Sequence, residues 1–300
     1  MLRSGTRRLA LTLLLLLGVS ANAIATHEMW VQHTYPQDQD KWWWDDDWWE
    51  LGLLPVPRNH QVVVEEASYD SGADEIPVTI YRPAGPGPYP GVLFQHGRRG
   101  LDDLTGLHPR RLAARGFVVV APDIWGGRFM NTYPIGHDYT VEKDVARGIE
   151  FLMRLSGLAG DRVCVVSHTR GGYMTLKALV NENMQEKGVA CYVSYYPHFQ
   201  DPNLPEPAQI YGYEPAVEKL MVPALIFFGE HEQYQRYRPI LEVAKFMARE
   251  GRDFRVIVYP GVGRGFDFRP PNVRVFADDL AAKDAMMRTA TFIRHHLLAQ

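Results

Sequence analysis

Residues Arg162–Ala178, RVCVVSHTRGGYMTLKA, decide the fold of this 300-residue chain. The apolar run Val163–Val166 is typical of a short strand that is buried on both faces of a parallel sheet. A tight corner follows, and Tyr173–Ala178 continues with the spacing of a helix. Strand, sharp corner and helix form a nucleophile elbow, a strained turn that displays one side chain at the top of a sheet. The displayed residue stands two before Gly171 and is Thr169, where a serine or a cysteine is the ordinary occupant.

On both sides of this stretch the chain alternates between strand and helix patterns. Runs at 61–67 and 76–82 flank a turn at 70–74 and predict an antiparallel hairpin. The later alternation predicts a single domain of the α/β class, a doubly wound, mostly parallel sheet with helices on both faces. Strands are expected at 91–95, 117–121, 189–196, 223–228 and 254–259, and helices at 107–115, 141–155, 240–250 and 278–298.

Composition and charge exclude some classes of partner. With 46% hydrophobic and 22% charged residues, the chain has the composition of an ordinary globular protein. Its net charge is −3, so it lacks the basic footprint of a nucleic-acid-binding protein. Cys164 and Cys191 both lie in apolar, strand-like runs. A disulfide between them is one alternative, and we expect two buried free thiols instead.

The first 25 residues have the pattern of a signal peptide. Three arginines precede the apolar run 9–19, which is too short for a comfortable membrane span. Small-x-small cleavage sites follow at 21–23 and 23–25. We therefore expect an exported protein, periplasmic or secreted, with an uncleaved anchor as the alternative.

Residues 26–58 form a tryptophan-rich arm ahead of the main domain, which we place at 59–300. Five of the seven tryptophans lie in Trp42–Trp49, among aspartates that keep the segment soluble. One interpretation is that the indoles pack onto the body of the protein. The other is an aromatic platform for a ligand, a partner protein or an envelope surface, because five adjacent indoles are hard to bury together.

Several short motifs occur in a fixed order along the chain, and on them residues 60–298 resemble the dienelactone hydrolase family of α/β-hydrolases. The resemblance implies an α/β-hydrolase fold, action on ester or lactone bonds, no cofactor, and a His96-Gly97 pair that opens the loop supplying an oxyanion amide. The motifs are Phe94–Gly97 (FQHG), Ala121–Gly126 (APDIWG), Asp161–Val163 (DRV), Ser194–Tyr196 (SYY), Phe228–Glu232 (FGEHE) and Tyr259–Phe266 (YPGVGRGF).

The resemblance also assigns the triad positions, and each carries a substitution. Thr169 stands at the nucleophile position, where its hydroxyl remains but its methyl group crowds the corner. Glu232 replaces the aspartate, a mild change. Arg264 replaces the histidine base, and a guanidinium cannot accept a proton from the hydroxyl. General-base help is worth about 100- to 10,000-fold in rate, so normal family chemistry is not expected.

Other histidines could replace the lost base. His168 adjoins Thr169, but the residue before a nucleophile usually points away from the attacking face. His96 opens the oxyanion loop, where the family carries the same residue for structural reasons. His231 stands beside Glu232 and is the favoured substitute.

The same positions also suit a binding protein. Arg264 facing Glu232 would form an ion pair, which is tolerable when it is well hydrogen-bonded. Alternatively, Arg264 with Arg98, Arg99 and Arg170 would make a positive mouth for a carboxylate or another anion. Plain solvated surface is the third interpretation of these arginines.

A doubly wound sheet presents its site at the carboxyl ends of the strands. The predicted pocket residues there are His96, Gly97, Arg98, Arg170, Asp123, Trp125 and Tyr196. No metal-ligand spacing stands out, and the pair His295-His296 is assigned to the surface.

Three functions follow from these observations. The favoured one is a non-hydrolytic or strongly impaired derivative that binds a small, anionic or ester-like molecule or a partner. The second is an active carboxyl-ester or lactone hydrolase that uses Thr169 with a non-standard base such as His231. The third is an interaction protein that docks a partner or an envelope surface through Trp42–Trp49.

Overall fold

The computed structural model describes residues 31–33, 60–270 and 272–298. The predicted signal peptide and the Trp42–Trp49 cluster lie outside these residues. Within them, no helix has the length and apolar character that a membrane span requires.

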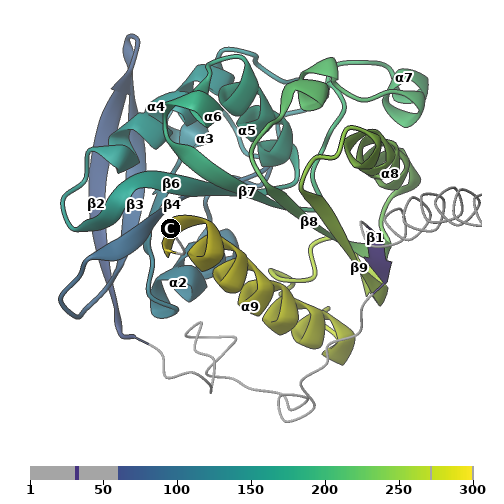
Figure 1. The fold of residues 1–300 in the computed structure, drawn as a ribbon. Coiled ribbons are helices and arrows are strands. Elements are labelled where there is room, and N and C mark those ends of the chain that lie inside the picture. The colour runs from purple at the N-terminus through teal and green to yellow at the C-terminus, as the bar shows by residue number, and fades with distance from the viewer. Residues whose placement is uncertain (1–30, 34–59, 271, 299–300) are drawn as a thin grey trace, which may run out of the picture.

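The described residues form one nine-stranded sheet in the order β1-β9-β8-β7-β6-β4-β5-β3-β2 (Figure 1). The hairpin pair β2–β3 and the pair β3–β5 are antiparallel, and every other neighbouring pair is parallel. The predicted mostly parallel, doubly wound sheet is therefore confirmed. The strands are β1 (Val31–His33), β2 (Val62–Ser71), β3 (Asp74–Pro83), β4 (Tyr89–Gln95), β5 (Val118–Pro122), β6 (Leu158–His168), β7 (Val189–Tyr195), β8 (Ala224–His231) and β9 (Phe254–Gly263).

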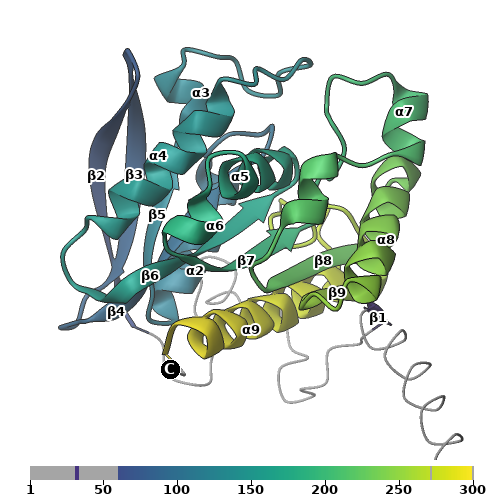
Figure 2. The same ribbon diagram turned by 45° about the horizontal axis from the view of Figure 1, so that its top comes forward.

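Helices cover both faces of the sheet (Figures 1 and 2). Helices α2 and α9 lie on one face, and α4, α5, α6 and α8 lie on the other. The long helices were predicted from the sequence, whereas the short ones have too few residues to show a period. The helices are α2 (Asp103–Ala114), α3 (Ile124–Gly127), α4 (Val141–Met153), α5 (Arg170–Val180), α6 (Met184–Lys187), α7 (Glu206–Tyr211), α8 (Tyr234–Arg249) and α9 (Phe276–Leu298), with a 3₁₀ helix η2 (Pro215–Lys219).

The centre of the sheet is the core of the domain. Every residue of β5 and of β7 is buried, as is Val163–Val166 of β6. Strands that are covered on both faces need such continuous apolar runs, so the pattern that identified the elbow strand reflects its burial. Because the strands from β4 to β9 run in parallel, their carboxyl ends open at one edge of the sheet.

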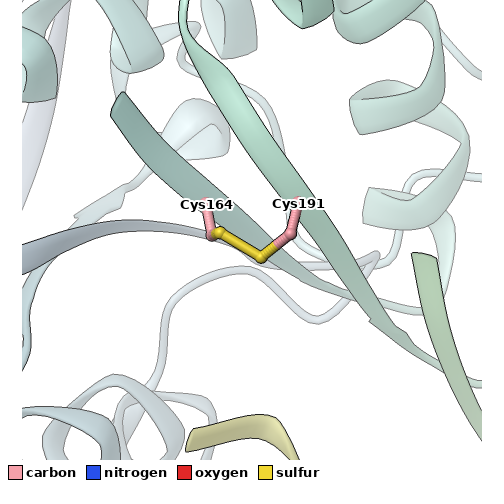
Figure 3. Close-up of a disulfide and its surroundings, with 2 residues drawn as sticks. All are labelled: Cys164 and Cys191. Atoms are coloured by element: carbon pink, nitrogen blue, oxygen red, sulfur yellow. A yellow bond between two sulfur atoms is a disulfide. The ribbon is translucent and has the colours of Figure 1, made fainter. Parts of the chain in front are cut away.

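A disulfide joins Cys164 of β6 to Cys191 of β7 (Figure 3). The two residues are register partners on neighbouring parallel strands, with their Cα atoms 4.8 Å apart. The expectation of two free thiols was therefore wrong. It could not have been corrected from the chain alone, because spacing does not show that the two strands pair in this register.

Candidate active site

The predicted elbow is present between β6 and α5. Thr169 has φ 50° and ψ −121°, a left-handed conformation that is strained for a β-branched residue. Hydrogen bonds on both sides hold it there. The Thr169 N–H donates to the carbonyl of Tyr195 at 3.1 Å, and its own carbonyl accepts from the Gly172 N–H at 3.0 Å.

Two glycines allow the chain to approach the elbow closely. A Cβ atom on Gly97 would lie 1.7 Å from Oγ1 of Thr169, so the hydroxyl sits directly against the start of the predicted oxyanion loop. A Cβ on Gly171 would lie 2.4 Å from the carbonyl oxygen of His96. Larger residues at either position would push the loop and the elbow apart.

Glu232 and Arg264, which the sequence analysis assigned to the acid and base positions, form an ion pair. Arg264 Nη1 donates to Oε1 of Glu232 at 2.9 Å, and the Glu232 side chain is buried. The Arg264 guanidinium also lies over the ring of Tyr196, 5.3 Å from its centroid. Arg264 is thus held in place both by Glu232 and by the ring of Tyr196.

His198 is a site residue that the sequence analysis missed. It follows β7, and its backbone N–H donates to the carbonyl of Thr169 at 2.9 Å. Its side chain is buried, and Nδ1 has no hydrogen-bond partner among the described residues. The available signal was position, because His198 stands two residues beyond Tyr196, in a loop already expected to border the pocket.

Four arginines act on this histidine: Arg98, Arg170, Arg236 and Arg264. Burial first, and then their charges, hold the pKa of His198 well below its usual value. Burial, followed by the charges of neighbouring arginines, also lowers the pKa of Arg236 and that of Arg170 to about 10. The imidazole is therefore neutral at pH 7, within a cluster of like positive charges.

Several donors of this cluster are unused. Nη2 of Arg264, Nε of Arg236 and Nε of Arg170 are buried and have no hydrogen-bond partner in the part of the chain that the structure describes. Oε2 of Glu232 is also buried without a partner there. Buried donors without partners cost stability, so three such guanidinium nitrogens in one place need an explanation.

Three of the four arginines that were predicted to form a positive mouth, Arg98, Arg170 and Arg264, act on His198. Arg98 donates to the carbonyls of Tyr133 and Pro134, and Arg170 to those of Pro134, Ile135 and Gly136. These two arginines therefore fasten the 133–136 loop beside the elbow. Arg99 pairs with Asp102 instead, and Arg236, on α8, was not predicted.

The predicted substitute bases occupy other environments. His231 is exposed at the end of β8, whereas its neighbour Glu232 is buried. His96 is buried, with Nε2 accepting from the N–H of Ile124 at 3.1 Å. That bond supports a structural role for His96.

The remaining predicted pocket residues support the loops. Trp125 Nε1 donates to the carbonyls of Gly97 and Arg98 at 3.1 and 3.2 Å, which fixes the oxyanion loop. Asp123 caps α3 through the N–H of Gly126. Asp123 also lines a separate pocket of about 580 Å³ between β2, β3 and α2.

A second polar cluster lies on the α2 and α9 face of the elbow strand. His168, the residue before Thr169, contacts His108 of α2 and Asp267 of the loop after β9. All three side chains are at most 3% exposed. The two imidazoles hold the pKa of Asp267 well below its usual value although burial alone would raise it. Burial lowers the pKa of His108 to about 4.

Comparison with known proteins agrees with this fold. The chain is 24% identical over 225 residues to a protein named usf from Aquifex pyrophilus, covering 69% of this chain and 89% of the relative. It is similar in structure to a hyperthermophilic esterase from the archaeon Pyrobaculum calidifontis, with a TM-score of 0.59, 19% identity, and 82% and 85% of the two chains covered. A dienelactone hydrolase-like promiscuous phosphotriesterase from metagenomic libraries gives a TM-score of 0.58 at 14% identity, with 78% and 98% covered.

Sheet order, elbow and helix layers together define an α/β-hydrolase fold in a single domain. Residues 76–297 match the model of the dienelactone hydrolase family, and the chain belongs to that family.

Proposed function

We propose that this protein binds a small carboxylate or a similar anion beside Thr169, with ester hydrolysis absent or strongly impaired. The observation that carries the proposal is the ion pair between Arg264 and Glu232, the residues that the sequence motifs assign to the base and acid positions. A guanidinium that is already bound to the acid cannot take the proton of a nucleophile. The fold is therefore that of a hydrolase family, while the residues beside Thr169 suit recognition better than catalysis.

The charges around His198 support an anionic ligand. Arg98, Arg170, Arg236 and Arg264 repel one another, and three of them keep buried N–H groups without partners. A carboxylate would accept from those donors and offset the repulsion in one step. Guanidinium groups bind carboxylates through two parallel hydrogen bonds, which favours a planar anion over a single-atom one.

Thermal denaturation with and without ligand tests this proposal. Succinate is the probe, succinamide is the uncharged control, and sodium chloride at equal ionic strength controls for screening. At 100 times its Kd a ligand contributes about 2.7 kcal/mol, which would raise the melting temperature by about 5–10 °C. Arg236→Met should abolish the shift, whereas Arg147→Met, at an exposed position on α4, should keep it. Equal shifts with succinate and succinamide would refute an anion site.

A second candidate function is slow ester hydrolysis through Thr169, and His198 favours it. This histidine is neutral, is buried with a free Nδ1, and is bound through its backbone to the nucleophile's own carbonyl. Neutral imidazole is the form that a general base requires. His198 thereby replaces His231 as the best candidate for a substitute base.

Hydrolysis of p-nitrophenyl acetate tests the second candidate. An active elbow predicts turnover that falls at least about 100-fold in both Thr169→Ala and His198→Gln. His231→Gln is the matched control and should retain the rate. Turnover that survives Thr169→Ala would assign the reaction to another part of the protein and leave the binding function as the proposal.

We also propose that the protein is exported. The signal-peptide pattern of residues 1–25 supports this, and so does the Cys164–Cys191 disulfide, because disulfides persist mainly in oxidising compartments. Fractionation of cells that express the full chain, with N-terminal sequencing of the product, tests both export and cleavage. Full-length protein confined to the cytoplasm would contradict the proposal.

A further inference from the structure

The buried cluster of His108, His168 and Asp267 brings three ligand atoms to one point. Oδ2 of Asp267 lies 3.0 Å from Nδ1 of His108 and 3.0 Å from Nε2 of His168. The two nitrogens lie 3.2 Å apart. One carboxylate oxygen and two imidazole nitrogens therefore form a nearly equilateral triangle.

This triangle has the size of one face of a zinc coordination shell. Zinc binds imidazole nitrogen and carboxylate oxygen at about 2.0–2.2 Å, which puts tetrahedral ligands about 3.3 Å from one another. The observed separations need to lengthen by only a few tenths of an ångström. Two imidazoles and one carboxylate also exclude magnesium and calcium as preferred ions, because those ions favour oxygen ligands.

Hydrogen bonds around the triangle orient its carboxylate ligand, whereas the outer nitrogens of the imidazoles, Nε2 of His108 and Nδ1 of His168, are buried without a partner among the described residues. The hydroxyl of Tyr196 donates to Oδ1 of Asp267, which leaves Oδ2 free to point at the two histidines. Nη1 of Arg111 donates to the backbone carbonyl of Asp267 at 2.7 Å and fixes that loop. Hydrogen bonds of this kind to a ligating carboxylate are what metal sites use to hold their ligands in place.

Aromatic side chains enclose the two imidazoles. The ring of Phe94 stacks on His108 with centroids 5.1 Å apart, and Phe268 packs against His168 at 5.5 Å. A dry shell of this kind strengthens the attraction between a cation and its ligands.

From this arrangement we propose that His108, His168 and Asp267 form a structural binding site for one zinc-type divalent transition-metal ion. Its ligands come from α2, from the end of β6 and from the loop after β9, three segments that are far apart in the chain. An ion bound there would tie these segments together directly behind the elbow. Its role would be to stabilise the fold, and the proposal is independent of what the arginines around His198 bind.

Metal analysis of the full-length protein tests the site. Protein that has been stripped with a chelator, loaded with Zn²⁺ and desalted should retain one ion per chain. Its melting temperature should rise with zinc concentration, because an ion that binds only the folded state stabilises it. X-ray absorption at the zinc edge should show two imidazole ligands at about 2.0 Å. That measurement uses the unmodified protein, so it does not depend on a variant that folds.

Variants locate the ion. His108→Gln should lose the retained zinc, and His295→Gln, at an exposed position on α9, should keep it. If His108→Gln fails to fold, Asp267→Glu keeps a carboxylate and should retain the ion with weaker affinity. The proposal is overturned if no ion is retained, if the spectrum lacks two imidazoles, or if His108→Gln holds zinc as well as the unmodified protein does.

Discussion

On one side of the elbow His198 lies among four arginines, and on the other side His168 and His108 share one carboxylate. The first region has an excess of positive charge and several buried donors without partners. In the second, one nitrogen of each imidazole contacts Oδ2 of Asp267, and only the outer nitrogens, Nε2 of His108 and Nδ1 of His168, are buried without a partner among the described residues. Tyr196 stands between them, with its ring under Arg264 and its hydroxyl on Asp267. The first region thus concentrates positive charge around His198, whereas in the second the two imidazoles share the negative charge of Asp267.

The largest effect on stability should come from disrupting the cluster of His108, His168 and Asp267. Asp267→Ala removes the carboxylate that serves both imidazoles and the Tyr196 hydroxyl, and it leaves those buried groups unpaired. We expect a loss of about 3–5 kcal/mol in the free energy of unfolding, measured by urea denaturation. Asp253→Ala, at a partly exposed carboxylate, should cost less than about 1 kcal/mol. A loss below 1 kcal/mol for Asp267→Ala would show that the cluster contributes little.

The next effect concerns catalysis on the side of the elbow where the four arginines surround His198. Arg264→His restores a histidine against Glu232 and removes one charge from the cluster. If the elbow is an intact scaffold that lacks only its base, kcat/KM for p-nitrophenyl acetate should rise by about 100-fold or more. The double variant Thr169→Ala with Arg264→His should lose that gain. No gain in the single variant would mean that the threonine hydroxyl, and not only the missing base, prevents hydrolysis.

A smaller effect is the dependence of the free energy of unfolding on pH, to which His198 on one side and His108 on the other contribute. The folded-state pKa of His198 is depressed below its usual value of 6.5, so the unfolded chain binds a proton first as the pH falls. Its stabilising contribution is therefore complete above pH 6.5 and is lost on acidification, by at most about 1.4 kcal/mol per pH unit. His108 contributes in the same direction down to its pKa of about 4.

One variant and one ligand test whether His198 causes this dependence of the unfolding free energy on pH. The free energy is measured by urea denaturation between pH 5 and pH 7, and its slope against pH is compared. His198→Gln should reduce the slope, and succinate should reduce it too, because a bound anion raises the pKa of the histidine beside it. His295→Gln, at an exposed site, should leave the slope unchanged. A slope that neither change affects would belong to the other side of the elbow.

The sequence predicted the fold more fully than the site, for a physical reason. Periodicity and apolar runs report burial, and burial determines where β4, β6, β7 and β9 lie. The elbow could be found because its strand, corner and glycines are consecutive. The ion pair of Arg264 with Glu232 was one of the predicted alternatives, because the family motifs carry both positions.

Side chains that meet through the fold could not be found in this way. His108, His168 and Asp267 are separated by 60 and 99 positions in the sequence. They therefore form no short metal-ligand motif that a sequence pattern could reveal. Arg236 lies in the first turn of α8, ahead of the helix at 240–250 that the sequence predicted. The disulfide likewise depends on the register of β6 against β7. In each case the missing information was which strand ends and helix faces become neighbours.

The smallest expected effect is a change in stability on removing one arginine from the cluster around His198. Arg236→Met keeps most of the apolar stem but removes one of the four repelling charges, so without ligand it should stabilise the protein by about 0.5–1 kcal/mol. With saturating succinate the order should reverse, because the unmodified protein gains binding energy that the variant cannot. Urea denaturation of both proteins, with and without succinate, measures this reversal in the order of stability. The control Arg147→Met should behave as the unmodified protein does. If Arg236→Met is less stable in both conditions, the arginine supports the fold through its hydrogen bond to Gln209. Repulsion between Arg236 and the other three arginines would then not destabilise the protein.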